Sequence, residues 1–173
     1  NNVALGYNFN TKDLGVSKNT LIEHVYYMEC SYLVRRIKNY RPSTKSVSRK
    51  LQRIYPYHFS LGFGWTGSLN FETIVASFID AEYYWRKNEK EVDFLVLDKS
   101  NKNNPRIMPI EVKESNNVAA NKLKPLLYFL DKYNLKEGVL IYQGEEEKER
   151  IKKIVITKIP LWKLGLSKIE LSM

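Results

Sequence analysis

The sequence predicts a protein of the α+β or α/β class, built as a small helical module followed by a compact sheet. Two observations predict this arrangement. Residues 11–34 place apolar side chains at helical spacing around a turn, and the chain from residue 71 onward alternates helical patterns with short apolar runs. A chain of 173 residues suffices for one domain, or for a helical module joined to a core of about 100 residues.

The N-terminal stretch has the pattern of a helix-turn-helix. A helix end is followed by a turn at Gly15 and by Ser17, a residue type that caps helices. The next helix carries apolar residues at roughly helical spacing, namely Leu21, Val25, Met28 and Leu33. The residues expected to face DNA from the start of this helix are Ser17, Lys18, Asn19 and Thr20.

Two short alternating segments, 33–40 and 51–57, flank the turn-rich sequence RPSTKSVS. A hairpin at this place would be the wing of a winged helix. The glycine-rich sequence GFGWTGSLN follows and indicates a module boundary near residue 65. We therefore expect a winged helix-turn-helix at residues 1–64 and a second module at residues 65–173.

The net charge of +9 favours a polyanionic partner such as DNA, although charge alone would also suit ribosomal or acidic-lipid contacts. The basic surplus is concentrated, because no Asp or Glu occurs from Ser31 to Phe71. We expect DNA contacts from the basic residues there, which are Arg35, Arg36, Lys38, Arg41, Lys45, Arg49, Lys50 and Arg53. The alternative is a helical packing module with a solvated basic face.

The second module is predicted to have the element order αβββαβ. A helix over 71–81 precedes three neighbouring strands that form an antiparallel meander, and a second helix and a further strand follow. The predicted ranges of these later elements are 83–86, 92–98 and 107–113 for the meander, 119–135 for the helix, and 137–144 for the strand. A charged hairpin loop, EEEKER, then leads to a strand over 151–159, and PLWKLGL closes the module as an edge strand or short helix.

Two carboxylates are expected to meet on this sheet. Strand side chains alternate, so Glu111 and Lys113 project to the same side, and Asp93 stands in an otherwise hydrophobic strand. If the two strands pair, Asp93 and Glu111 approach each other and repel unless a cation binds between them. Mg²⁺, or Mn²⁺ in its place, suits such oxygen ligands and keeps waters for a substrate phosphate.

This arrangement suits phosphodiester hydrolysis, in which a metal activates water and Lys113 orients that water or stabilises developing negative charge. Glu72 begins the helix before the meander and is predicted to complete the metal ligands. Arg86 and Lys122 are candidates for holding phosphate nearby. The alternative for an acid–lysine pair on a strand is a surface ion pair, worth under about 1 kcal/mol.

A family resemblance lies in five runs of the chain: FETIVASF, YYWRKNEKEVDFLVLD, IMPIEVKESNN, LKPLLYFLDKYNLKEGVLIYQG and IVITKIPLWKL. They resemble the C-terminal domain of uncharacterised function found behind AAA+ ATPase modules in many archaea and bacteria. The resemblance covers about residues 65–165, and more loosely the winged helix at 11–60. That domain is similar to the PD-(D/E)XK nuclease superfamily, which implies a restriction-endonuclease-like core. The positions that match its motif are Glu72, Asp93, Glu111 and Lys113, and Val92 stands where the superfamily name has Pro.

The resemblance also implies an AAA+ ATPase module in a longer parent chain, because this sequence has no GxxxxGK[ST] phosphate loop. Three hypotheses follow. The first is a metal-dependent, DNA-binding endonuclease-like domain. The second is a catalytically silent module that binds DNA or a partner and so targets or regulates the ATPase. The third is an interaction domain without nucleic acid, which the concentrated basic charge disfavours.

The cellular setting is expected to be the cytoplasm. The single cysteine, Cys30, excludes an internal disulfide and any multi-cysteine zinc site. No apolar run approaches the roughly 18 residues of a membrane span, and no export leader is recognisable. The first residue is Asn, which fits a fragment of a longer protein.

Overall fold

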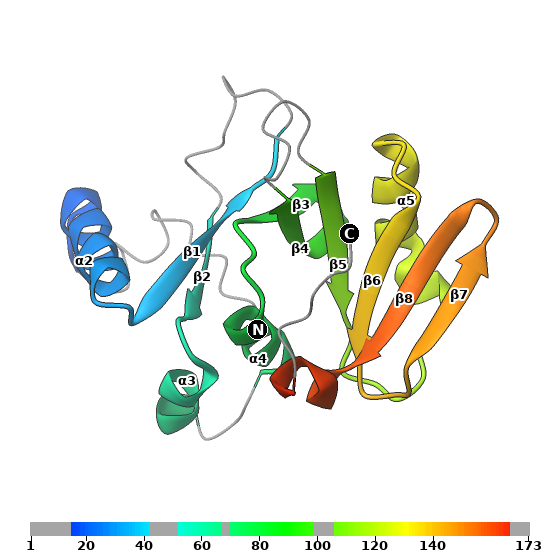
Figure 1. The fold of residues 1–173 in the computed structure, drawn as a ribbon. Coiled ribbons are helices and arrows are strands. Elements are labelled where there is room, and N and C mark those ends of the chain that lie inside the picture. Colours follow the sequence, from blue (N-terminus) through cyan, green and yellow to red (C-terminus); the bar gives the residue numbers. More distant parts are fainter. Residues whose placement is uncertain (1–14, 42–51, 67–69, 99–105, 167–173) are drawn as a thin grey trace.

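The computed structural model describes residues 15–41, 52–66, 70–98 and 106–166, and it shows a mixed α/β fold (Figure 1). Eight strands form one mixed sheet in the order β2-β1-β3-β4-β5-β6-β8-β7. The strands are β1 (Val34–Asn39), β2 (Gln52–Pro56), β3 (Tyr83–Lys87), β4 (Lys90–Asp98), β5 (Arg106–Val112), β6 (Glu137–Tyr142), β7 (Glu147–Ile151) and β8 (Ile154–Pro160). The helices within these ranges are α2 (Lys18–Cys30), α3 (Phe59–Thr66), α4 (Phe71–Phe78) and α5 (Lys124–Lys132), with 3₁₀ turns η2 (Ala120–Leu123) and η3 (Leu161–Gly165).

The element order predicted after residue 71 is present. Helix α4 precedes β3, β4 and β5, which pair antiparallel as a meander. Helix α5 then crosses to β6, which pairs in parallel with β5. A right-handed helical crossover is the usual way to bring such a strand alongside a parallel neighbour. The sheet is extended beyond β6 by β8, in parallel, and by β7, antiparallel at the edge.

The N-terminal predictions are met in part. Helix α2 begins after Ser17, whose side chain accepts a hydrogen bond from the Thr20 N–H at 3.1 Å. The predicted hairpin is present as the antiparallel pair β1 and β2, while its turn lies outside the described residues. The first helix of the predicted helix-turn-helix also lies outside them. Strand β1 pairs in parallel with β3, so the hairpin extends the same sheet that carries the later strands.

The core has two parts, one on each face of the sheet. On one face Val75 and Ala76 of α4 pack with alternate strand residues such as Phe94 and Ile110. On the other face the buried side of α5 packs with a second set of strand residues, and its core members are Leu126, Phe129 and Leu130. Alternation along the strands explains the division, because neighbouring strand residues point to opposite faces.

Helix α4 is shorter than the predicted range of 71–81. Asn70 caps its start by accepting hydrogen bonds from the N–H groups of Glu72, at 2.9 Å, and Thr73, at 3.3 Å. The helix ends at Phe78, because Ile79 takes an extended backbone conformation with φ −111° and ψ 143°. The chain therefore reaches β3 directly after α4, with Ile79 and Ala81 buried in the core.

Two predicted loops contain regular structure. Helix α3 runs into the glycine-rich stretch that was predicted to be a loop. A Cβ atom on Gly62 would lie 3.3 Å from Pro56 Cγ, so this glycine allows α3 to approach β2 closely, and tertiary packing overrides low helix propensity. The charged EEEKER segment is largely strand β7, because an edge strand exposes charged side chains readily.

The C-terminal end matches one of the two predicted alternatives. PLWKLGL forms the short helix η3, not a strand. In the described part of the chain no helix is both long and apolar enough to cross a membrane.

Candidate functional site

Asp93 lies at an irregularity of strand β4. Tyr83 of β3 pairs with Leu95, but Trp85 pairs with Val92, so β4 advances three residues while β3 advances two. An extra residue of this kind is a β-bulge, which breaks the regular alternation and re-aims a side chain. The bulge falls where Asp93 lies, between the apolar residues Val92 and Phe94 of β4.

The bulged side chain is turned toward β5. Asp93 Oδ2 accepts a hydrogen bond of 2.8 Å from the backbone N–H of Val112. The carboxylate thus lies at the end of the β4–β5 ladder, where Phe94 pairs with Ile110. In this antiparallel register the next residue on β5 after Ile110 is Glu111, so the two predicted carboxylates reach the same end of the sheet.

Glu111 of β5 and Lys113, the residue that follows the strand, lie side by side, as predicted. Ile110 and Val112 belong to the core on the α4 face of the sheet. Glu111 lies between them and points to the opposite face, and its partner in the β5–β6 register, Leu140, belongs to the core on that face. Lys113 Nζ donates a hydrogen bond to Glu111 Oε1. Glu111 is 3% exposed, and its Oε2 is buried without a hydrogen-bond partner among the described residues. Such an atom is costly to bury unless a cation or donor reaches it.

The two carboxyl groups are electrostatically unfavourable in their charged forms. Burial raises the pKa of Asp93 well above its ordinary value, and Glu111 and Glu72 raise it further. Burial raises the pKa of Glu111 to about 7, although Lys113 opposes the change. Burial lowers the pKa of Lys113, but Glu111 and Asp93 outweigh this and raise it. A buried acid pair of this kind attracts either protons or a metal cation.

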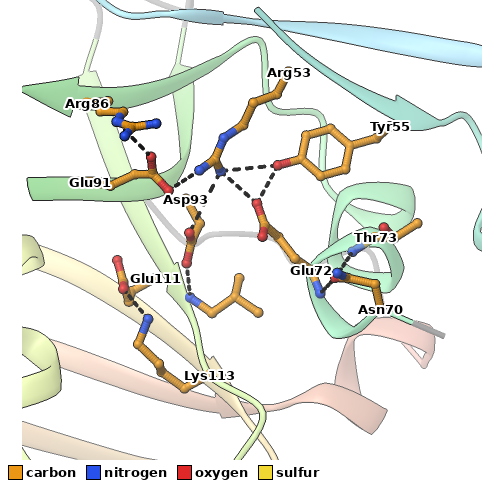
Figure 2. Close-up of polar contacts among 11 residues, drawn as sticks. Arg53, Tyr55, Asn70, Glu72, Thr73, Arg86, Glu91, Asp93, Glu111 and Lys113 are labelled. Atoms are coloured by element: carbon orange, nitrogen blue, oxygen red, sulfur yellow. Dashed lines mark hydrogen bonds and ion pairs between the residues drawn. The ribbon is translucent and has the colours of Figure 1, made fainter. Parts of the chain in front are cut away.

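Arg53 is the unexpected member of the site (Figure 2). It was predicted as a DNA contact, but it is only 5% exposed and its guanidinium lies over the ring of Tyr84, 4.7 Å from the centroid. Arg53 Nη1 is 2.7 Å from Glu72 Oε1 and 3.8 Å from Asp93 Oδ1, and Nη2 pairs with Glu91. The arginine therefore connects the hairpin to the carboxylates of the later strands.

Glu72 faces Arg53 and Tyr55. The Tyr55 hydroxyl donates to Glu72 Oε1, and burial raises the pKa of this hydroxyl, which keeps it protonated as a donor. Figure 2 shows Glu72, Glu91 and Asp93 around the guanidinium, with Glu111 and Lys113 beyond Asp93. The structure thus divides the predicted acids between an arginine cluster and the Asp93–Glu111 pair.

The Asp93–Glu111 pair fits a divalent cation in part. No set of three Asp, Glu, His or Cys side chains is arranged to hold a metal within the described ranges. Mg²⁺ does not need such a set, because it is usually bound by one or two carboxylates together with waters and substrate phosphates. The donor set and the unpartnered Oε2 of Glu111 are therefore compatible with one hydrated ion.

Only some of the predicted DNA contacts are exposed. Ser17, Lys18 and Asn19 are exposed at the start of α2, with Thr20 partly buried, and Lys38 is exposed on β1. Arg35 donates to the Ile79 carbonyl at 3.0 Å, and Arg36 pairs with Glu29. Arg41 is half-buried, and Lys45, Arg49 and Lys50 lie outside the described residues.

A cavity of about 410 Å³ lies beside β1. Its lining carries both signs of charge, since Arg35, Arg36 and Lys38 share it with Glu29, Asp80 and Glu82. The basic charge of the hairpin is therefore partly offset by acids from other segments.

Sequence reasoning missed Arg53, Tyr55 and Glu91 as members of the site. The available signal was indirect, because a carboxylate in a hydrophobic strand needs a compensating partner. Arg53 and Tyr55 are two residues apart on β2, so their side chains lie on the same, buried face of the strand, which is consistent with a shared role. Nothing local to residues 52–56 shows that this face meets β4.

The sequence profile of a family described as "Domain of unknown function (DUF4143)" matches residues 71–163, more than half of the chain. The chain belongs to the DUF4143 family. The DUF4143 segment begins with α4 and ends in η3, whereas Arg53 and Tyr55 precede it. It contains the four predicted site residues Glu72, Asp93, Glu111 and Lys113. Comparison with curated proteins and with solved structures gave no match.

The raised carboxyl pKa values predict a pH-dependent stability in the absence of metal. Between the ordinary Glu value of 4.5 and about 7, folded Glu111 holds a proton that the unfolded chain has released. The unfolded state then binds fewer protons, so the free energy of unfolding falls as pH rises through this window, by up to about 3 kcal/mol. Asp93 acts in the same direction.

Urea denaturation in EDTA at pH 5 and pH 8 measures this effect. The Glu111→Gln variant should lose much of the pH 5 to 8 difference, whereas Glu89→Gln, at an exposed turn, should keep it. An unchanged pH dependence in Glu111→Gln would show that Glu111 is not the titrating group.

Proposed function

We propose that this DUF4143 chain is a DNA-binding, metal-dependent nuclease-like domain that hydrolyses phosphodiesters and forms the C-terminal part of a cytoplasmic AAA+ ATPase. One observation carries the proposal: Asp93 and Glu111 are buried at the same end of neighbouring strands, beside Lys113. The unpartnered Oε2 of Glu111 gives this pair capacity for a cation.

The fold around the site supports the same proposal. The order α4-β3-β4-β5-α5-β6, with an antiparallel meander and a parallel fourth strand, is the arrangement expected of a PD-(D/E)XK core. The bulge at Asp93 is also in keeping with a functional site, because bulges are over-represented beside active sites.

In this proposal Asp93 and Glu111 hold Mg²⁺ or Mn²⁺. A bound ion would supply a Lewis acid for the phosphate and lower the pKa of a coordinated water. Lys113 remains protonated, because the neighbouring carboxylates raise its pKa, and it orients the water or stabilises negative charge on the phosphate. Glu72, predicted as a third ligand, is engaged by Arg53 and Tyr55, and we assign it no direct contact with the ion.

DNA contact is assigned to the exposed residues of the N-terminal part. The start of α2 and Lys38 present polar and basic side chains to solvent. Contacts of this kind bind the phosphate backbone and weaken as salt rises. They position the duplex, and they do not by themselves choose a sequence.

A second candidate function is a catalytically silent module that binds DNA or a partner and regulates the attached ATPase. Arg53 favours it, because a permanent cation already pairs with Glu72 and Glu91 beside Asp93. In that reading the acids are compensated without a metal.

Cleavage assays separate the two functions. Supercoiled plasmid and single-stranded DNA are incubated with Mg²⁺, Mn²⁺ or EDTA, using the wild-type chain, Asp93→Ala and Lys113→Ala. The nuclease proposal expects metal-dependent cleavage that both variants lose while their salt-sensitive DNA binding persists. No cleavage by the wild type, with DNA binding equal in all three proteins, would favour the silent module.

A further inference from the structure

We infer that Arg53 is a built-in counter-ion that takes Glu72 and Glu91 as its closest partners and so restricts the site to one divalent cation, held between Asp93 and Glu111. The inference rests on the proposed metal-dependent function. It adds the metal stoichiometry of the site and the residue that sets it.

The guanidinium of Arg53 contacts two carboxylates from different elements, Glu72 of α4 and Glu91 of β4. Arg53 Nη1 lies 2.7 Å from Glu72 Oε1, and Nη2 pairs with Glu91 Oε1. The side chains of Glu72 and Glu91 are 12% and 26% exposed, so both have lost much of their hydration. Partly buried carboxylates are stabilised by a cation close by, and here the side chain of Arg53 supplies it.

Two tyrosines hold the guanidinium of Arg53 in place. Its guanidinium lies over the Tyr84 ring, and Nη1 donates to the Tyr55 hydroxyl at 3.2 Å. Strand pairing fixes the backbone position of Arg53, because this residue is in register with Ile37 of β1, and β1 pairs with β3. An arginine with an exposed fraction of 5% in such a frame is not a freely moving surface side chain.

A guanidinium keeps its charge at every accessible pH, and its planar fork suits two carboxylates at once. A divalent ion at Glu72 and Glu91 would have to displace this fork or lie beside it. Like charges at such short range repel strongly in a poorly solvated site. Arg53 therefore occupies the position that a second metal ion would need.

The remaining acceptor atoms are enough for one ion. Lys113 engages Glu111 Oε1, and Oε2 has no hydrogen-bond partner in the part of the chain that the structure describes. The Val112 N–H engages Asp93 Oδ2, and Oδ1 lies 3.8 Å from Arg53 Nη1. Glu111 Oε2 and Asp93 Oδ1, whose ion pair with Arg53 is longer than that of Glu72, are the acceptor atoms for a single hydrated ion. This matches the few protein ligands that Mg²⁺ takes.

Equilibrium dialysis against Mn²⁺, with bound metal counted per folded chain, tests the inference. The wild type should bind one ion at saturation. Arg53→Met keeps the apolar stem but frees Glu72 and Glu91, and it should bind two, whereas Arg53→Lys keeps the charge and should bind one. Arg86→Met is the matched control, because Arg86 also pairs with Glu91, at 3.7 Å, but is 48% exposed, and it should bind one.

Circular dichroism establishes which variants are folded. If Arg53→Met does not fold, Glu72→Gln decides the point: it should still bind one ion, because Glu72 is a partner of Arg53 and not of the metal. Two ions on the wild type, one on folded Arg53→Met, or none on Glu72→Gln would overturn the inference. No ion on the wild type would instead overturn the proposed metal-dependent function itself.

Discussion

Replacing Arg53 with alanine is expected to lower the free energy of unfolding by about 3–5 kcal/mol, the usual cost of removing one partner from a buried ion pair. The variant leaves Glu72, Glu91 and Asp93 close together without the guanidinium that pairs with them. The loss should be largest near neutral pH and smaller in acid, where protonation removes the uncompensated charge. Urea denaturation at pH 5 and pH 8 in EDTA measures both effects.

Arg86→Ala is the control for this loss. Arg86 pairs with the same Glu91 but is 48% exposed, so its removal should cost under about 1 kcal/mol. Equal losses in the two variants would show that Arg53 contributes no more than a surface ion pair.

Replacing Lys113 with methionine is expected to lower the rate of metal-dependent cleavage by about 10²–10³-fold, as for the loss of one group that stabilises transition-state charge. The side chain touches Glu111 through one hydrogen bond and is half-buried, so the variant should fold. Its Mn²⁺ affinity should be retained, because the proposed ligands Asp93 and Glu111 are unchanged. Single-turnover cleavage at saturating Mn²⁺ measures the chemical step.

Lys148→Met is the matched control. Lys148 lies on β7 at the far edge of the sheet, and its removal should leave the single-turnover rate unchanged. A Lys113→Met rate close to that of wild type would exclude a role for Lys113 in the chemistry.

Local patterns predicted much of the fold. The Ser17 cap, the two hairpin strands and the order of elements from α4 to β6 all follow from turn chemistry and from periodicities of 3.6 and 2 residues. The same alternation predicted that Glu111 and Lys113 lie side by side, at the end of β5. These features depend on residues close together in the sequence.

The rest depends on contacts between distant residues. The parallel pairing of β1 with β3 is what brings Arg53 to Glu91 and Asp93, and no local pattern in the basic hairpin indicates it. The bulge at Asp93 could not be predicted from local sequence either, because it is defined only by the register between β3 and β4. The charge of Arg53 predicted an exposed DNA contact, whereas its buried partners make it part of the site.

A plasmid-cleavage assay with Mn²⁺ decides whether Asp93 and Glu111 form a metal-dependent nuclease site. It compares the rate of the wild type with that of Asp93→Ala at the same protein concentration, with EDTA controls. We expect cleavage by the wild type that EDTA abolishes and that falls to the EDTA background in Asp93→Ala, while circular dichroism shows both proteins folded. Equal rates for wild type and folded Asp93→Ala, or no Mn²⁺-dependent cleavage by the wild type, would contradict a metal-dependent nuclease site at Asp93 and Glu111.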